Sequence, residues 1–223
     1  SEVTPSRTRE FLGLTIDSHR LLLRVPPEKV KATTRAIRQT IAASQSGSLT
    51  IRGLAGLIGK LQALGPAVSP ARFRSRSLLH LKNEALAGSR VRWDHSVVLD
   101  TPALVELSWW LTEFQQWNGK SILPLLPQCV LTTDASSYGW GGWLGNKSAR
   151  GFWSRPESRR SSNARELTAV VFSVFAFAPM LAGRVVHVRT DNITTRAYIN
   201  HQGGRSRFLT ELYRPLQLWL ERT

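Results

Sequence analysis

Residues 129–144, CVLTTDASSYGWGGWL, hold two short apolar stretches separated by four turn-forming residues, SSYG at 136–139. Stretches of this kind on both sides of a turn predict two antiparallel strands, over 129–133 and 140–144. A third short stretch at 151–154, GFWS, predicts a further strand. We therefore expect a sheet that begins with three antiparallel strands.

The chain after these strands alternates between helix and strand. Residues 167–183 are the longest uncharged run and predict a buried helix, which Ser162 or Asn163 can cap. This run has 17 residues and a proline, which is shorter than the ~18 to 20 residues that cross a bilayer, so no membrane partner is expected. The elements predicted after it are a strand at 185–190, a helix at 192–202 and a last helix from Ser206. The order βββαβα is typical of an α/β domain with a mixed sheet, in which a crossover helix leads to a parallel strand.

Two domains are expected, because the residue composition and periodicity change in the middle of the chain. Residues 118–127, NGKSILPLLP, combine glycine with prolines and have no helical period, which is typical of a linker. The linker separates a first domain over 1–117 from a second domain over 128–223.

The first domain is predicted to be a β-hairpin followed by helices. The apolar stretches 9–16 and 20–25 flank the turn-forming triplet DSH and predict two paired strands. Start signals for helices follow at Pro27, Thr50, Pro70 and Asp100.

The composition favours a nucleic-acid partner in a reducing compartment. Lysine and arginine number 30 against 15 acids, a net charge of +15, and 24 of the 30 are arginine. Arginine pairs with phosphate through two hydrogen bonds and stacks on bases, although a GC-rich genome would also raise its share. Cys129 is the only cysteine, which excludes a disulfide within the chain and a cysteine-based zinc site. We expect an intracellular protein, nuclear or cytoplasmic, that is not secreted.

Three acids are predicted to meet at one edge of the mixed sheet. Asp134 and Asp191 each end a predicted buried strand, and right-handed crossover geometry places those strands side by side. Glu166 lies in the first turn of the crossover helix and can face the same point. Three carboxylates without sulfur or histidine ligands favour Mg²⁺ or Mn²⁺. Taken singly, Asp191 could instead cap its helix and Glu166 could complement the helix dipole.

Three motifs carry a resemblance to a known family: TTDASSYGWGGWL at 132–144, SSNARELTAVV at 161–171 and VHVRTDNITTRAYIN at 186–200. Together they resemble the ribonuclease H domain of retroelement reverse transcriptases, with the greatest similarity to DIRS-like elements. The resemblance implies that Asp134, Glu166 and Asp191 bind two Mg²⁺ ions and cleave the RNA strand of an RNA/DNA hybrid.

The resemblance extends upstream of the second domain. TREFLGLTID at 8–17, VPPEKV at 25–30 and LTIRGLAGLIGKL at 49–61 are similar to the end of a reverse transcriptase palm, its primer-gripping hairpin and its thumb. This implies that fingers and palm precede the chain in the full-length protein. The Y-x-D-D motif of the palm is absent and the chain has no Asp-Asp pair, so we expect no polymerase activity from this chain alone.

The chain departs from the family at its end. The family has a fourth carboxylate on a final helix beyond a fifth strand, and we expect the domain to stop at Thr223, before both. Glu211 and Glu221 are acids on the predicted last helix, where they are expected to face solvent. Activity with Mg²⁺ is therefore expected to be weak and to be partly restored by Mn²⁺.

Candidate contacts to nucleic acid lie in both domains. Gly53, Gly56 and Gly59 recur every third residue of a predicted helix, which predicts close approach of a duplex or, equally, of another helix. Arg72 and Arg76 are predicted to share a helix face that binds phosphate or is merely solvated. The other candidates are Lys60, Ser136, Asn163, Asn192, Arg205 and Arg207.

The predicted function is that of a metal-dependent endonuclease acting on RNA/DNA hybrids within a reverse transcriptase. The alternative is a catalytically silent ribonuclease H-like module that binds nucleic acid or scaffolds a larger assembly. A transposase or integrase of the same fold family is disfavoured, because there the glutamate comes last in the chain, whereas Glu166 comes second of the three acids.

Overall fold

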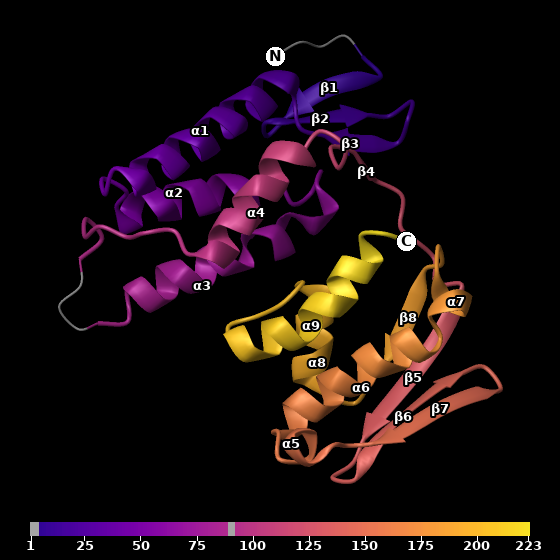
Figure 1. The fold of residues 1–223 in the computed structure, drawn as a ribbon. Coiled ribbons are helices and arrows are strands. Elements are labelled where there is room, and N and C mark those ends of the chain that lie inside the picture. Colours follow the sequence, from indigo (N-terminus) through magenta and orange to yellow (C-terminus); the bar gives the residue numbers. More distant parts are fainter. Residues whose placement is uncertain (1–4, 89–91) are drawn as a thin grey trace. The chain divides into compact units, whose positions relative to one another are not determined.

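The computed structural model describes residues 5–88 and 92–223, which fold into two compact units (Figure 1). The units divide between Pro124 and Leu125, inside the stretch that is expected to be a linker. Across these described ranges, no helix combines the length and apolar character that crossing a membrane requires.

The first unit contains a four-stranded antiparallel sheet in the order β1-β2-β3-β4. The prediction of one strand over 9–16 is wrong, because the chain reverses at Leu12 and Gly13, with φ of 50° and 70°. Glycine reaches positive φ without a Cβ clash, which permits a two-residue turn within the expected strand. The strands are β1 (Thr8–Phe11), β2 (Leu14–Asp17), β3 (Leu22–Arg24) and β4 (Lys120–Ser121).

Part of the stretch 118–127 belongs to the first unit. Its strand β4 pairs with β3, and Asn118 joins the same edge through its side chain. The amide of Asn118 accepts a hydrogen bond from the Val25 N–H at 2.7 Å and donates one to the Val25 carbonyl at 2.9 Å. This pair of bonds ties the chain ahead of the unit boundary to the start of the helical region.

Four α-helices follow the first three strands, and two of their predicted caps are confirmed. Thr50 accepts a hydrogen bond from the Gly53 N–H at 3.1 Å, and Asp100 accepts one from the Ala103 N–H at 2.9 Å. The helices are α1 (Pro27–Gln45), α2 (Ile51–Gln62), α3 (Arg76–Ala85) and α4 (Thr101–Thr112).

The helix predicted from Pro70 starts later than expected. Residues 69–71 and 73–75 form two short 3-10 turns, and the backbone leaves helical geometry at Arg74, where ψ is 16°. Arg74 is buried, and its guanidinium lies 4.9 Å from the ring centre of Trp109. Its carbonyl accepts a hydrogen bond from the Trp110 indole at 2.7 Å, so packing against α4 fixes the kink.

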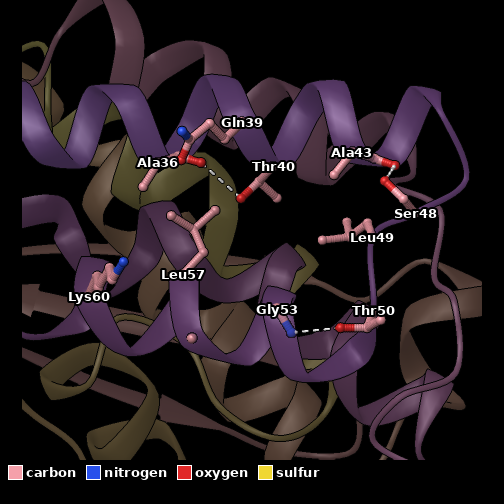
Figure 2. Close-up of a pocket in the computed structure, with 11 residues that line it drawn as sticks. Ala36, Gln39, Thr40, Ala43, Ser48, Leu49, Thr50, Gly53, Leu57 and Lys60 are labelled. Carbon is pink, nitrogen blue, oxygen red and sulfur yellow. Dashed lines mark hydrogen bonds between the residues drawn. The ribbon is translucent and has the colours of Figure 1, made fainter.

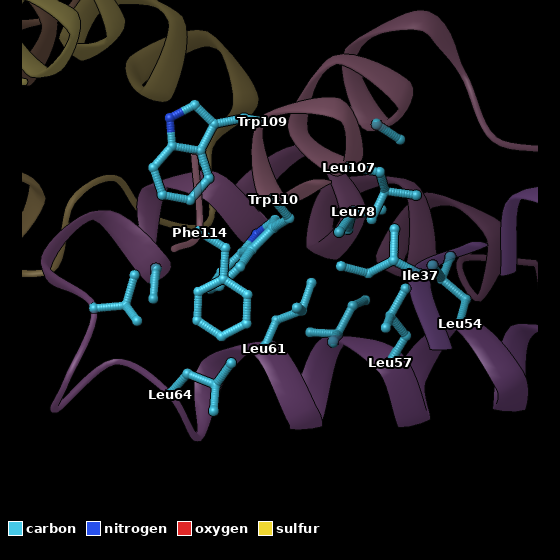
Figure 3. Close-up of a cluster of buried hydrophobic side chains, with 14 of the residues drawn as sticks. Ile37, Leu54, Leu57, Leu61, Leu64, Leu78, Leu107, Trp109, Trp110 and Phe114 are labelled. Atoms are coloured by element: carbon cyan, nitrogen blue, oxygen red, sulfur yellow. The ribbon is translucent and has the colours of Figure 1, made fainter. Parts of the chain in front are cut away.

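Side chains from the four helices of the first unit form its hydrophobic core (Figure 3). Trp110 and Phe114 from α4 meet edge to face with ring centres 5.1 Å apart. They lie over Leu61 of α2 and Leu64, which follows the end of α2 (Figure 3). Leu14 of β2 belongs to the same core, and Leu23 of β3 packs against it. Burying a large apolar side chain contributes about 1.5 to 3 kcal/mol, so this core stabilises the helices and the sheet together.

The second unit is built on a mixed sheet in the order β7-β6-β5-β8, which confirms the predicted α/β class and the RNase H-like strand order. β5 pairs antiparallel with β6 and parallel with β8. The third strand is displaced from its predicted position at 151–154 to 147–152. The strands are β5 (Cys129–Ala135), β6 (Gly139–Leu144), β7 (Lys147–Phe152) and β8 (Val186–Arg189).

Helix α6 (Ser162–Ala176) packs against β5 and β6, and Gly142 makes this approach possible because a Cβ there would collide with Ser173. The predicted cap is off by one residue, since Ser161 accepts the hydrogen bond from the Ala164 N–H. Trp140 packs on Phe172 of α6, while Trp143 is 46% exposed, as expected for residues on opposite faces of a strand. The other helices are α5 (Arg155–Ser158), α7 (Ala178–Leu181), α8 (Ile193–Asn200) and α9 (Arg207–Leu220).

Candidate active site

The ends of β5 and β8 position two of the three predicted acids. The parallel pairing of Thr132 with Arg189 places the ends of the two strands side by side. Asp134 lies two residues beyond Thr132 and Asp191 two residues beyond Arg189, so the two aspartates leave the sheet at the same edge. Both are exposed.

Glu166 completes a cluster of three carboxylates. One oxygen of Asp134, one of Glu166 and one of Asp191 all lie within 4.8 Å of one another. Glu166 lies in the second turn of α6 and not in the predicted first turn, because the helix already begins at Ser162. Its side chain is only 6% exposed, because α6 packs against β5. The convergence expected from strand order and crossover geometry is present in the structure.

The alternative of a helix cap at Asp191 is not what the structure shows. Asn192 is the N-cap of α8, and its side-chain oxygen accepts a hydrogen bond from the Thr195 N–H at 2.8 Å. The Asp191 carboxylate therefore does not cap α8 and belongs to the cluster instead.

The electrostatics of the cluster disfavour three ionised acids. Burial raises the pKa of Glu166 to about 7, and the negative charges of Asp191 and then Asp134 add to the increase. A backbone hydrogen bond from Ala135 offsets part of the rise. The second carboxylate oxygen of Glu166, Oε2, is buried and has no hydrogen-bond partner.

A divalent cation fits these three residues. Glu166 has a buried carboxylate oxygen without a hydrogen-bond partner, and it clusters with the carboxylates of Asp134 and Asp191. A bound cation would provide the positive charge that these carboxylates lack. The donors are all carboxylate oxygens, which Mg²⁺ and Mn²⁺ prefer.

A side-chain hydrogen bond joins the two segments that carry Glu166 and Asp191. Asn192 Nδ2 donates to Asn163 Oδ1 at 2.9 Å. Asn163 lies three residues before Glu166 in α6, and Asn192 directly follows Asp191. Asn163 and Asn192, both candidate nucleic-acid contacts, are therefore next to the carboxylate cluster. The hydrogen bond between them holds the two segments together against the repulsion between Glu166 and Asp191.

The remaining candidates of the second unit occupy two different places. Ser136 Oγ accepts hydrogen bonds from the N–H groups of Tyr138 and Gly139, both at 3.1 Å, so it organises the turn next to Asp134. Arg205 and Arg207 are exposed at the start of α9, on a different element from the acids.

In the first unit, Gly53, Gly56 and Lys60 line one groove between α1 and α2, with a volume of about 310 Å³ (Figure 2). Gln39 and Thr40 of α1 form part of the opposite wall. A Cβ at Gly56 or Gly59 would meet no atom within 4 Å, so close packing of another helix of this unit does not explain these glycines.

The prediction that Arg72 and Arg76 share a helix face is wrong. Arg72 lies between the two 3-10 turns and Arg76 is the first residue of α3, so no continuous helix relates them.

Sequence reasoning missed a pocket beside Asp134. Its volume is about 470 Å³, and Tyr138, Arg150 and Phe152 line it together with Asp134. The shifted position of β7 explains the omission, because a strand starting at Gly151 would leave Arg150 in a loop.

The comparison with protein families matches the second unit. Residues 127–212 match the RNase H-like domain found in reverse transcriptase. Within the second unit, these residues are thus similar in sequence to that domain. A comparison with curated proteins gives no match.

Solved structures of a foamy viral protease-reverse transcriptase are similar to this chain at low identity. One, in complex with double-stranded DNA, has 14% identity and a TM-score of 0.41, covering 87% of this chain and 39% of that chain. Another, in complex with an RNA/DNA hybrid, has 11% identity and a TM-score of 0.40, covering 97% of this chain and 28% of that chain. The chain thus spans well under half the length of these proteins.

Proposed function

We propose that the second unit hydrolyses the RNA strand of RNA/DNA hybrids with two divalent cations, Mg²⁺ or, as a substitute, Mn²⁺. The observation that carries the proposal is the cluster of Asp134, Glu166 and Asp191, in which Glu166 Oε2 is buried and lacks a partner. The match of residues 127–212 to the RNase H-like domain found in reverse transcriptase supports the choice of substrate.

The three acids are proposed to bind the cations from different sides, because Glu166 is buried and the two aspartates are exposed. When bound, the cations activate the attacking water and stabilise the charge on the leaving oxygen of the phosphodiester. Glu166 supplies an oxygen from the buried side, held in place by α6. Asp134 and Asp191 are exposed and supply oxygens on the side that a phosphodiester can reach.

The first unit is proposed to hold the duplex. Its hairpin and helices would act as the primer grip and the thumb and connection of a reverse transcriptase, preceded by fingers and palm, in a DIRS-like retroelement. Gly53, Gly56 and Lys60 support this role, because the groove that they line combines bare backbone with a positive charge. Arg72 and Arg76 of this unit, and Arg205 and Arg207 of the second unit, are further candidates for phosphate contacts.

One observation favours a second candidate function, a silent module that binds nucleic acid. Within the described residues the cluster holds three acids, whereas the RNase H domains that the chain resembles have four. The net charge of +15 would serve binding equally well in both cases.

Cleavage of a labelled RNA/DNA hybrid tests the enzyme proposal. We expect slow, hybrid-selective cleavage with Mg²⁺ and faster cleavage with Mn²⁺, which binds oxygen ligands more tightly and is less demanding of geometry. Duplex RNA and single-stranded RNA are the controls and should remain intact. Binding of the hybrid without cleavage under either metal would favour the silent module.

Hybrid affinity should fall steeply with salt, because binding to phosphates releases counterions. For about six phosphate contacts, the affinity should drop by about a thousandfold between roughly 50 and 200 mM salt. Fluorescence anisotropy of a labelled hybrid in chelator measures this. Salt-insensitive binding, or none at low ionic strength, would contradict the prediction.

A pair of lysine variants locates one of these contacts. Lys60→Ala should reduce the slope of log affinity against log salt by about one. Lys31→Ala is the matched control, because Lys31 is exposed on α1 and already paired with Glu28 at 3.0 Å. Equal slopes for the two variants would remove Lys60 from the interface.

A further inference from the structure

The pocket beside Asp134 lies on the face of the second unit's sheet that is opposite to α6. Asp134 pairs with Gly141, and Gly141 pairs with Arg150, so an acid, a glycine and a cation stand in one row across β5, β6 and β7. In the next row Gly139 pairs with Phe152. Partners in such rows point to the same face, which places Phe152 beside Arg150, while Gly139 and Gly141 leave these two rows of the middle strand without side chains of their own.

Two aromatic side chains of the pocket are highly exposed. Phe152 is 91% exposed and Tyr138 is 80% exposed. Neither ring is in contact with another aromatic ring of the described residues. Leaving a large apolar side chain in water forgoes a stabilisation of the fold, so folding does not account for either residue.

The two aromatic residues are held together by the backbone. Trp153 donates its N–H to the Tyr138 carbonyl at 3.0 Å and its indole N–H to the Ser136 carbonyl at 2.9 Å. Trp153 is 8% exposed and directly follows Phe152, so these bonds fix the end of β7 against the β5–β6 turn. The pocket is therefore formed before any ligand arrives.

The positive charge of Arg150 and the exposed rings indicate which kind of ligand the pocket binds. Arg150 is exposed, and its guanidinium makes no ion pair or side-chain hydrogen bond with the part of the chain that the structure describes. A guanidinium binds phosphate, and exposed rings stack on bases, so the pair matches a nucleotide. Bases inside a duplex already stack on their neighbours, whereas an unpaired base has a free face.

We propose that the pocket formed by Tyr138, Arg150 and Phe152 binds an unpaired nucleotide of the strand that lies on the carboxylate cluster. The inference rests on the proposed function, which makes that strand the RNA of a hybrid. Because Asp134 belongs to both the cluster and the pocket, the unpaired nucleotide is close to the bond to be cleaved. The second unit then prefers the junction where a hybrid meets single-stranded RNA.

Binding in chelator tests the proposal without cleavage. A hybrid with a single-stranded RNA extension should bind about tenfold more tightly than the blunt hybrid, the order expected for one base stacked on an aromatic ring. Y138A/F152A should remove this preference and leave the blunt affinity unchanged. Arg150→Ala should weaken the extended hybrid most, whereas Arg184→Ala, the same charge loss at an exposed position outside the pocket, should weaken both equally.

Two further variants test whether the loss of preference comes from a general disturbance of the structure. Phe175→Ala removes an exposed ring from α6, away from the pocket, and should retain the preference. Phe152→Trp should retain it as well, since an indole also stacks. Equal binding of blunt and extended wild-type complexes, a preference for a DNA extension, or a preference that survives Y138A/F152A would overturn the proposal. Absence of cleavage with the RNA preference intact would instead count against the proposed function alone.

Discussion

Replacing Asp134 with asparagine should abolish hybrid cleavage, with a loss of about a thousandfold or more in rate under Mn²⁺. Asp134 lies next to the last residue of β5, which pairs with β8, the strand that precedes Asp191, and packs against α6, the helix that carries Glu166. The amide keeps the shape of the side chain but removes the negative charge and one strong metal-binding oxygen. Cleavage of a labelled hybrid with Mn²⁺ measures the effect, and anisotropy in chelator shows that hybrid binding is retained.

Glu221→Gln is the matched control for this loss. Glu221 follows α9 and accepts a hydrogen bond from Gln217 at 3.2 Å, which an amide oxygen can replace. It does not belong to the carboxylate cluster of the described residues. Glu221→Gln should cleave at the wild-type rate. Cleavage by Asp134→Asn at a rate similar to that of Glu221→Gln would contradict the assignment of Asp134.

The positions of the two aspartates could be predicted from the sequence because they depend on strand ends. Thr132 and Thr133 before Asp134, and VHVR before Thr190 and Asp191, are apolar or β-branched stretches that predict strands. Right-handed crossover geometry then predicts that these two strands lie side by side in the sheet. The burial of Glu166 could not be predicted in the same way, because it depends on how closely α6 approaches β5.

The first hairpin shows where local signals are too weak. The expected strand at 9–16 is broken by Leu12 at positive φ, a conformation that leucine adopts rarely and that no sequence rule assigns to it. The adjacent Gly13 was the only cue to a turn. Similarly, Arg74 has the sequence context of a solvated arginine, yet it is buried on Trp109, a contact from a helix 30 or more residues later in the chain.

The pocket beside the cluster was missed because β7 has an atypical sequence. KSARGF contains one large apolar residue, and that residue, Phe152, is exposed. Its pairing with β6 comes from the tight connection at Gly145, which has φ of 60°, and not from a hydrophobic alternation. The register set by this turn places Arg150 in the same row as Asp134, with Gly141 between them. Composition and periodicity do not predict that arrangement.

Replacing Glu166 with glutamine should stabilise the metal-free second unit above neutral pH. The folded state holds the pKa of Glu166 at about 7, above its ordinary value of 4.5, so folding favours the protonated acid. The stability that Glu166 contributes is complete below pH 4.5 and is lost as the pH rises through 7. At pH 8 in chelator the wild type therefore carries a penalty of up to about 3 kcal/mol that the neutral amide avoids.

Thermal unfolding at pH 5 and pH 8, in chelator and with Mg²⁺, separates this effect from packing. At pH 8 in chelator, Glu166→Gln should melt several degrees above the wild type, and the difference should shrink at pH 5. Mg²⁺ should raise the melting temperature of the wild type and have less effect on the variant, because a ligand bound only by the folded state stabilises it. Glu221→Gln should match the wild type in every condition. A variant less stable than the wild type at pH 8 in chelator would mean that the Glu166 carboxylate is already satisfied without a cation, and the metal site would have to be sought elsewhere.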